Sequence, residues 1–318
     1  MKAIRKLAAT IVLATATAAV AAYPERPIKI VVPFAAGGPS DAIARTLGRA
    51  LSASVGQPVV VENKPGAEGL IAAQSVFSAP ADGYTLFLSG TSSSVALSAL
   101  RKDPGFDPLQ FTPVTTVAAV TFCLYVNPDV PARTVAELVT HVKANPGKLN
   151  YAVAANSEFM AASQLMKATG MRMEKVPYKG SAQAIPELLA GRVQVYFAPM
   201  TPERLAYAKD GRLRMLATVS PARTAFTPQV PTMAEAGYPE IVLTRWNSLL
   251  GPPKMPADVV GRIAREVEKV LANPEVRAQF DNLTMEAGSS TPETLATMER
   301  SAATMWKDFV RENDIPRE

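Results

Sequence analysis

The chain has 318 residues, with 33 Lys and Arg against 28 Asp and Glu, and a formal net charge of +5. It contains one cysteine and one histidine, which excludes an internal disulfide and a zinc, copper or haem site built from those residue types. No run of basic residues indicates nucleic-acid binding, so we expect no nucleic-acid partner. We also expect no metal and no cofactor.

The first 22 residues have the pattern of an export signal. Three basic residues precede an apolar run over residues 7–20, and small residues follow that run. Because the run is shorter than the roughly 20 apolar residues of a membrane-spanning helix, it predicts a signal peptide over residues 1–22, cleaved near Ala21 or Ala22. Cleavage leaves 30 Lys and Arg against 28 Asp and Glu, a net charge of +2, in an exported chain.

The segment IKIVVPFAAGGPSD, residues 28–41, joins a strand pattern to a helix pattern. Gly38 is the expected N-cap of the helix, with Pro39 at its first position. Glycines let the backbone approach a ligand and a helix N-terminus favours anions, so this loop predicts an anion site. The loop lacks the spacing of nucleotide-binding loops. An ordinary turn between a strand and a helix is the alternative.

Strand and helix patterns alternate along the rest of the chain. Further strands are expected at 59–61, 84–88, 120–126, 149–153, 193–197 and 213–219, and helices at 71–77, 161–166, 182–190 and 259–271. This alternation is typical of an α/β protein with a mostly parallel sheet. Ligands bind beyond the carboxyl ends of such strands. Four small-residue loops, namely the loop after the first strand and those at 89–94, 154–157 and 179–181, are therefore candidates for one cleft, with plain turns as the alternative.

The sequence context of the single cysteine and the single histidine indicates structural rather than catalytic roles. Cys123 lies in an apolar strand and is expected in the core. His141 lies on a helix with a capping box that begins at Thr134, and no nucleophile is near it in the sequence. A second capping box, beginning at Ser290, is expected to start the last helix, whose apolar stripe includes Trp306.

Five fragments of the sequence, taken together, resemble one family. They are VPFAAGGPSD (32–41), VENKPGA (61–67), DGYTL (82–86), VPYKGS (176–181) and PTMAEAG (231–237). In their order and spacing they resemble the Bug-type solute receptors, the periplasmic binding components of tripartite tricarboxylate transporters. The resemblance runs from residue 23 to about residue 309.

The resemblance implies an α/β, type II periplasmic-binding-protein fold with a ligand cleft between two domains. Domain I would comprise residues 23–120 plus 241–318, and domain II residues 121–240. The implied function is that of a monomeric periplasmic receptor, not an enzyme, which binds a small carboxylate and delivers it to integral-membrane permease subunits.

The resemblance also assigns ligand-binding residues. The first loop would hold one carboxylate through backbone N–H groups and water, and the energy of such hydrogen bonds requires no deeply buried cation. Trp246 has core packing as its alternative role. The residues assigned in this way are Phe34, Ala35, Ala36, Gly37, Gly38, Pro39, Ser40, Asp41, Thr91, Ser92, Ser93, Asn156, Ser157 and Trp246.

One loop departs from the family pattern. Residues 152–160 read AVAANSEFM, bulkier than the family's usual Gly- and Ser-rich loop, and they include Glu158. We hypothesise that the distal pocket is not a tricarboxylate pocket. Glu158 would select an amine or amide, or Phe159 and Met160 would pack on an apolar or aromatic acid. The alternative is that Phe159 and Met160 face the core.

Two other functions compete with the receptor interpretation. A sensor of the same fold would signal to a membrane partner when it closes on its ligand. A hydrolase would need an activated nucleophile, and the single histidine lies in none of the candidate loops. We therefore favour the receptor.

Overall fold

The computed structural model describes residues 23–318 apart from seven single positions and, in addition, two side chains. The seven positions are Ser92, Lys179, Val242, Thr244, Asp314, Pro316 and Glu318, and the two side chains are those of Glu68 and Ser98. The predicted signal peptide and the candidate residue Ser92 thus lie outside the described residues. Within the described part, no helix is both long and apolar enough to cross a membrane.

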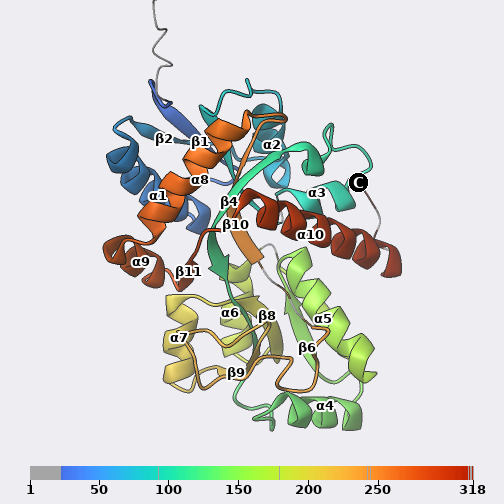
Figure 1. Cartoon of the computed structure of the whole chain (residues 1–318). Coiled ribbons are helices and arrows are strands. Elements are labelled where there is room, and N and C mark those ends of the chain that lie inside the picture. Colours follow the sequence, from blue (N-terminus) through green and yellow to red (C-terminus); the bar gives the residue numbers. More distant parts are fainter. Residues whose placement is uncertain are drawn as a thin grey trace, which may run out of the picture.

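The larger sheet has six strands in the order β11-β4-β10-β3-β1-β2 (Figure 1). They are β1 (Ile28–Val32), β2 (Val59–Asn63), β3 (Thr85–Gly90), β4 (Thr112–Val120), β10 (Arg245–Gly251) and β11 (Met285–Ala287). β2, β1 and β3 pair in parallel, whereas β10 and β11 pair antiparallel with their neighbours.

The smaller sheet has five strands in the order β7-β6-β8-β5-β9. They are β5 (Phe122–Val126), β6 (Asn150–Val153), β7 (Glu174–Pro177), β8 (Val195–Pro199) and β9 (Arg214–Thr218). β7, β6 and β8 are parallel, and β5 is antiparallel to both β8 and β9. The expectation of a mostly parallel sheet is therefore wrong, because three of the five strand pairings in the larger sheet and two of the four in the smaller sheet are antiparallel. The strands through which the chain enters and leaves a sheet run against their neighbours.

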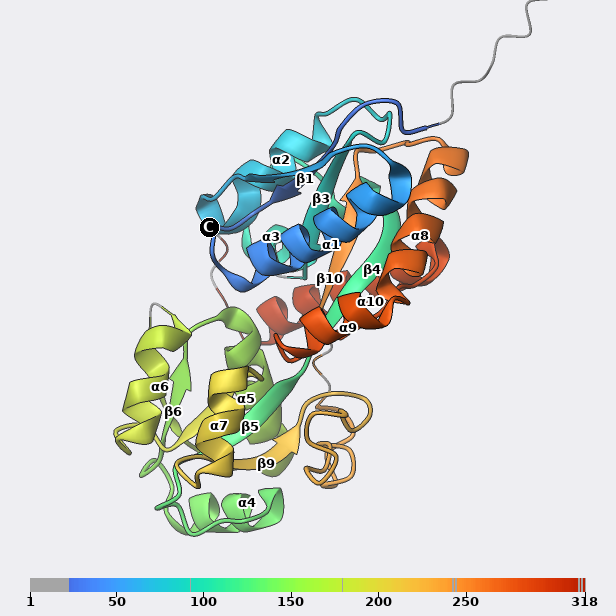
Figure 2. The same cartoon turned by 90° about the vertical axis from the view of Figure 1, so that its left-hand side faces the viewer.

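Helices cover both faces of each sheet (Figures 1 and 2). The helices are α1 (Pro39–Val55), α2 (Leu70–Phe77), α3 (Val95–Leu100), α4 (Val135–Ala144), α5 (Asn156–Thr169), α6 (Ser181–Leu189), α7 (Pro202–Lys209), α8 (Ala257–Leu271), α9 (Pro274–Asp281) and α10 (Pro292–Glu312). On the larger sheet, α1, α8 and α9 share one core, and α2, α3 and α10 pack on the other face. On the smaller sheet, α4 and α5 lie opposite α6 and α7. This two-sided burial explains why strands such as β5 are apolar on both faces.

Local signals in the sequence set several helix ends. Gly38 is the N-cap of α1 and Pro39 is its first residue, both as predicted, and Gly56 ends the helix in the left-handed conformation. Thr134 caps α4 by accepting a hydrogen bond from the N–H of Glu137, also as predicted.

The predicted start of α10 is wrong by one residue. Thr291, not Ser290, is the N-cap, and its hydroxyl accepts from the N–H of Thr294. Pro292 occupies the first helical position, which leaves the residue before it as the cap. Cys123 is fully buried, as predicted, and His141 lies partly buried on α4.

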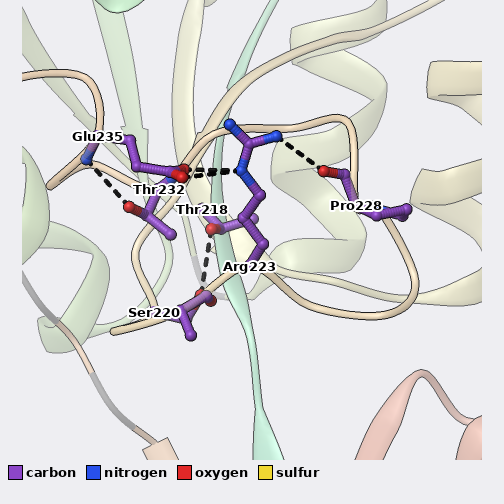
Figure 3. Close-up of polar contacts among 7 residues, drawn as sticks. Thr218, Ser220, Arg223, Pro228, Thr232 and Glu235 are labelled. Atoms are coloured by element: carbon purple, nitrogen blue, oxygen red, sulfur yellow. Dashed lines mark hydrogen bonds and ion pairs between the residues drawn. The ribbon is translucent and has the colours of Figure 1, made fainter.

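The chain connects the two sheets by two crossings. β4 leads directly through Thr121 into β5, and residues 219–244 return the chain from β9 to β10 (Figure 2). The second crossing is a long connection, and polar contacts stabilise it (Figure 3). Arg223 Nε lies 3.0 and 2.8 Å from the two carboxylate oxygens of Glu235, and Arg223 Nη1 donates to the carbonyl of Pro228. Thr232 and Glu235 cap each other's backbone N–H groups.

Candidate functional site

Loops from both sheets line one cavity of about 300 Å³. Each contributing loop follows the carboxyl end of a strand: β1, β3 or β6. This is the position where open α/β sheets bind ligands. The lining residues are Phe34, Thr91, Ala96, Leu100, Ala154, Ala155, Asn156, Ser157, Arg245 and Trp306.

A larger cavity, of about 590 Å³, lies beside β9, the edge strand of the smaller sheet. It is lined by α7 and by residues 226–230, and none of the candidate loops reaches it. Arg214 borders it, but its guanidinium donates to the carbonyls of Val130 and Ala132. The 300 Å³ cavity is therefore the better candidate site, because it gathers loops from both sheets.

The loop between β1 and α1 forms the first wall of this cavity. Phe34 lines the cavity, whereas Ala35, Ala36 and Gly37 are exposed beside it. Gly37 has φ +84°, a conformation that favours glycine. Its N–H donates to Asp41 Oδ2 at 2.9 Å, so this amide is used within the loop.

Asp41 holds this wall in place. It is buried, and its Oδ2 also accepts a hydrogen bond from Arg45 Nε at 2.9 Å. The Arg45 hydrogen bond, followed by that from Gly37, lowers the pKa of Asp41 to about 2. Oδ2 of this carboxylate therefore holds the loop in its conformation. Gly38, Pro39 and Ser40 form the N-terminus of α1, whose first N–H groups have no acceptor within the helix.

The loop after β3 supplies one lining residue. Thr91 borders the cavity and is almost fully buried. Ser93 is fully buried, and its hydroxyl is hydrogen bonded to the backbone of Gly90. Thr91 thus lines the cavity, and the hydroxyl of Ser93 holds the adjacent turn.

The loop between β6 and α5 forms the facing wall. Asn156 and Ser157 begin α5 and line the cavity. Glu158 does not line it and is 3% exposed. Its Oε2 accepts from the N–H groups of Ala154 and Ala155, at 2.5 and 3.0 Å, and its Oε1 accepts from Tyr196 Oη at 2.9 Å. Burial raises the pKa of Glu158.

The geometry does not support the hypotheses that Glu158, Phe159 and Met160 contact the ligand. Both oxygens of Glu158 are held by protein donors, so they are not directed at an amine of a ligand. Met160 is fully buried, and the Phe159 ring packs edge-on against Phe309, with ring centroids 5.6 Å apart. This arrangement agrees with the alternative that both side chains face the core.

Trp246 lies behind the cavity rather than on its surface. It is 7% exposed, and its indole Nε1 donates to Glu299 Oε1 at 3.2 Å. Ser94 Oγ lies 3.3 Å from the other oxygen of Glu299. Burial raises the pKa of Glu299 to about 7. This buried carboxyl joins α10, β10 and the loop after β3 directly behind the cavity.

Arg245 is a lining residue that the sequence reasoning missed. It is the only charged residue of the segment 241–250, which was expected to cross between domains. Successive side chains of a strand point to opposite faces. Trp246 therefore faces Glu299, while Arg245 faces the cavity. The sequence signal for Arg245 is that it is a single charged residue in an otherwise uncharged segment.

The fold and the cavity define the class of two-domain periplasmic binding proteins. Comparison with known proteins specifies the family. A model described as "Tripartite tricarboxylate transporter family receptor" matches residues 43–315. The chain belongs to this family.

Individual relatives agree with this assignment. The chain is 35% identical to Protein BugT of Bordetella pertussis over 317 residues, covering 96% of this chain and 97% of BugT. The structure of the periplasmic binding protein BugD has 31% identity and a TM-score of 0.74, over 93% of this chain and 100% of BugD. The structure of R. palustris Rpa4515 with adipate has 29% identity and a TM-score of 0.76, over 91% of this chain and 97% of Rpa4515.

Proposed function

We propose that the protein is an exported solute receptor that binds a small carboxylate in the 300 Å³ cavity and delivers it to a tripartite tricarboxylate-type membrane transporter. The observation that carries the proposal is the convergence of loops from both sheets on one cavity. Membership of the receptor family and the adipate bound by Rpa4515 support a carboxylate ligand.

The proposal includes a two-domain division with boundaries near residues 120/121 and 240/241. In its support, β4 and β10 belong to the larger sheet, and β5 and β9 to the smaller one. Closure of two such units around a ligand is a common receptor motion. The signal-like segment 1–22 supports export. We propose that the protein is a monomer and binds integral-membrane permease subunits.

In this proposal the cavity binds its ligand and does not transform it. His141, the single histidine, lies on α4, and α4 contributes no lining residue. Ser157 and Thr91 line the cavity without a histidine to activate them. Hydrogen bonds to a charged ligand contribute about 1.5–3 kcal/mol each. Three or four of them reach the roughly 8 kcal/mol of a micromolar complex after the cost of capture.

The test is calorimetric titration of the mature protein with mono-, di- and tricarboxylates, combined with thermal denaturation. We expect saturable 1:1 binding by at least one carboxylate, with the ligand recovered unchanged. Gly38→Val should weaken that binding at least tenfold, because it covers the N-terminus of α1. The fold should persist, since a Cβ at Gly38 meets only the carbonyl of Ala35, at 3.6 Å.

Gly288→Val is the matched control. A Cβ added at Gly288 would meet no atom within 4 Å, and this glycine lies outside the cavity lining, so the variant should bind like the wild type. Absence of binding by every carboxylate, or consumption of the ligand, would contradict the proposal. Ligand-dependent capture of a membrane protein other than a permease would favour the sensor.

A further inference from the structure

One residue that lines the cavity, Arg245, is cationic. Binding of a single carboxylate by the loop between β1 and α1 does not use this charge. Arg245, the first residue of β10, lies where the chain returns to the larger sheet. Its Nη1 lies 3.5 Å from Ser157 Oγ on the facing wall, and its guanidinium lies 5.2 Å from the centre of the Phe122 ring. Arg245 thus stands between elements of both sheets while bordering the cavity.

The surroundings of Arg245 are largely apolar. Ala96, Leu100, Ala154 and Trp306 contribute carbon surface to the same cavity. Burial disfavours the charged form and lowers the pKa of Arg245, while the negative charge of Glu158 acts in the opposite direction. An arginine in a protein nevertheless keeps its proton at neutral pH. The cavity is therefore positive at this end.

The acidic side chains around the cavity have their own donors. Asp41 accepts from Gly37 and Arg45 on the first wall. Glu158 accepts from two backbone N–H groups and Tyr196, and Glu299 accepts from Trp246 and Ser94. A guanidinium carries five N–H donors in a planar fork that matches a carboxylate. A ligand anion can therefore join the contacts that Arg245 already makes in the protein.

We infer that Arg245 is the specificity-determining residue of the cleft and binds a second anionic group of the ligand. This inference rests on the proposed function. The loop between β1 and α1 would hold the first carboxylate of a small dianion, and Arg245, beside Ser157, would hold the second. A monocarboxylate with the same number of carbon atoms would place a methyl group next to the guanidinium. The methyl group would remove water from the cation without supplying a hydrogen-bond acceptor in its place, which is unfavourable.

The first test uses the wild-type protein and ligand pairs matched in carbon number: succinate with butyrate, and adipate with hexanoate. We expect at least one dicarboxylate to bind about tenfold or more tightly than its monocarboxylate partner, the range of a charge-assisted hydrogen bond. Equal affinities within both pairs would overturn the inference. Absence of binding by all four acids, and by the wider carboxylate panel, would instead contradict the proposed function itself.

The second test uses Arg245→Gln, with Arg300→Gln as the matched control, because Arg300 is exposed on α10. We expect Arg245→Gln to weaken binding of the dicarboxylate about tenfold or more and binding of the monocarboxylate by less than about twofold. Arg300→Gln should change neither. Equal losses for both ligands would show that Arg245 acts only on the structure, for example as a counterion of Glu158.

A third variant helps to separate an effect on specificity from an effect on folding. Arg245→Lys keeps the positive charge but loses the planar fork. It should retain part of the preference for the dicarboxylate, between the wild type and Arg245→Gln. Thermal denaturation of each variant separates loss of folding from loss of specificity. An unchanged preference in a folded Arg245→Gln protein would overturn the inference.

Discussion

The two walls of the cavity are built in different ways. The first wall, residues 34–41, is an exposed loop whose shape depends on one carboxylate, that of Asp41, and on the conformational freedom of Gly37. The facing wall, at the start of α5, rests on the buried Glu158 and lies beside the cation of Arg245. In the proposed function, the first wall would bind any carboxylate through backbone N–H groups. The facing wall would distinguish one ligand from another through its side chains.

Because the facing wall depends on a buried carboxylate, we expect substitutions there to lower the free energy of unfolding more than substitutions in the first wall. Glu158→Ala should destabilise the protein by about 3 kcal/mol, because the N–H groups of Ala154 and Ala155 and the hydroxyl of Tyr196 lose their acceptor. Denaturant unfolding measures the effect. The exposed Glu240 provides the control variant Glu240→Ala, which should stay within about 0.5 kcal/mol of the wild type. A similarly small loss for Glu158→Ala would contradict the structural role given to this carboxylate.

The carboxyl of Glu299 behind the cavity should make stability depend on pH. Its pKa is about 7 in the folded chain against an ordinary 4.5, so the folded state binds its proton more tightly than the unfolded state. This group therefore stabilises the fold less as the pH rises from about 4.5 to 7. Relative to wild type, Glu299→Gln should gain roughly 3 kcal/mol at pH 8 and less than about 1 kcal/mol at pH 5.

Unfolding measured at several pH values between about 5 and 8 checks this prediction. Glutamine keeps an acceptor for the indole N–H of Trp246, so the difference between variant and wild type isolates the titration of Glu299. A difference that does not change with pH would show that the carboxyl titrates normally.

Damage to the first wall should weaken all carboxylates alike. Asp41→Ala removes the acceptor of Gly37 N–H and of Arg45, which loosens the loop. We expect about tenfold weaker binding of both members of a matched mono- and dicarboxylate pair, equivalent to about 1.4 kcal/mol. Calorimetric titration measures both affinities. A loss confined to the dicarboxylate would reverse the roles assigned to the two walls.

The smallest expected effect is that of a methyl group at Gly37. Gly37→Ala adds a Cβ with no neighbour within 4 Å, so its cost is that of the left-handed backbone alone, about 1 kcal/mol. Thermal or denaturant unfolding detects a change of this size. Gly180→Ala, at an extended glycine with equal space around it, is the control and should cost less. Equal costs would show that the loop relaxes around the new residue.

Local features of the first wall could be predicted from the sequence. Gly38 and Pro39 fix the start of α1 through preferences that act within a few residues. The same holds for Thr134 at the start of α4. α7 and α9 were not predicted, since each is a short helix of eight residues that begins at a proline after a break in the pattern.

The sequence by itself determined the alternation of strands and helices, the start of α1 and, through five fragments, the family of this protein. The tertiary structure decided which side chains meet in the cavity. Arg245 and Trp246 are neighbours in the chain, but the two-residue period of β10 and its pairing with β4 direct one to the cavity and the other to Glu299. Glu158 was open to a binding role until the fold buried it against Tyr196. Contacts between residues far apart in the chain depend on strand register and packing, which short-range patterns in a sequence do not specify.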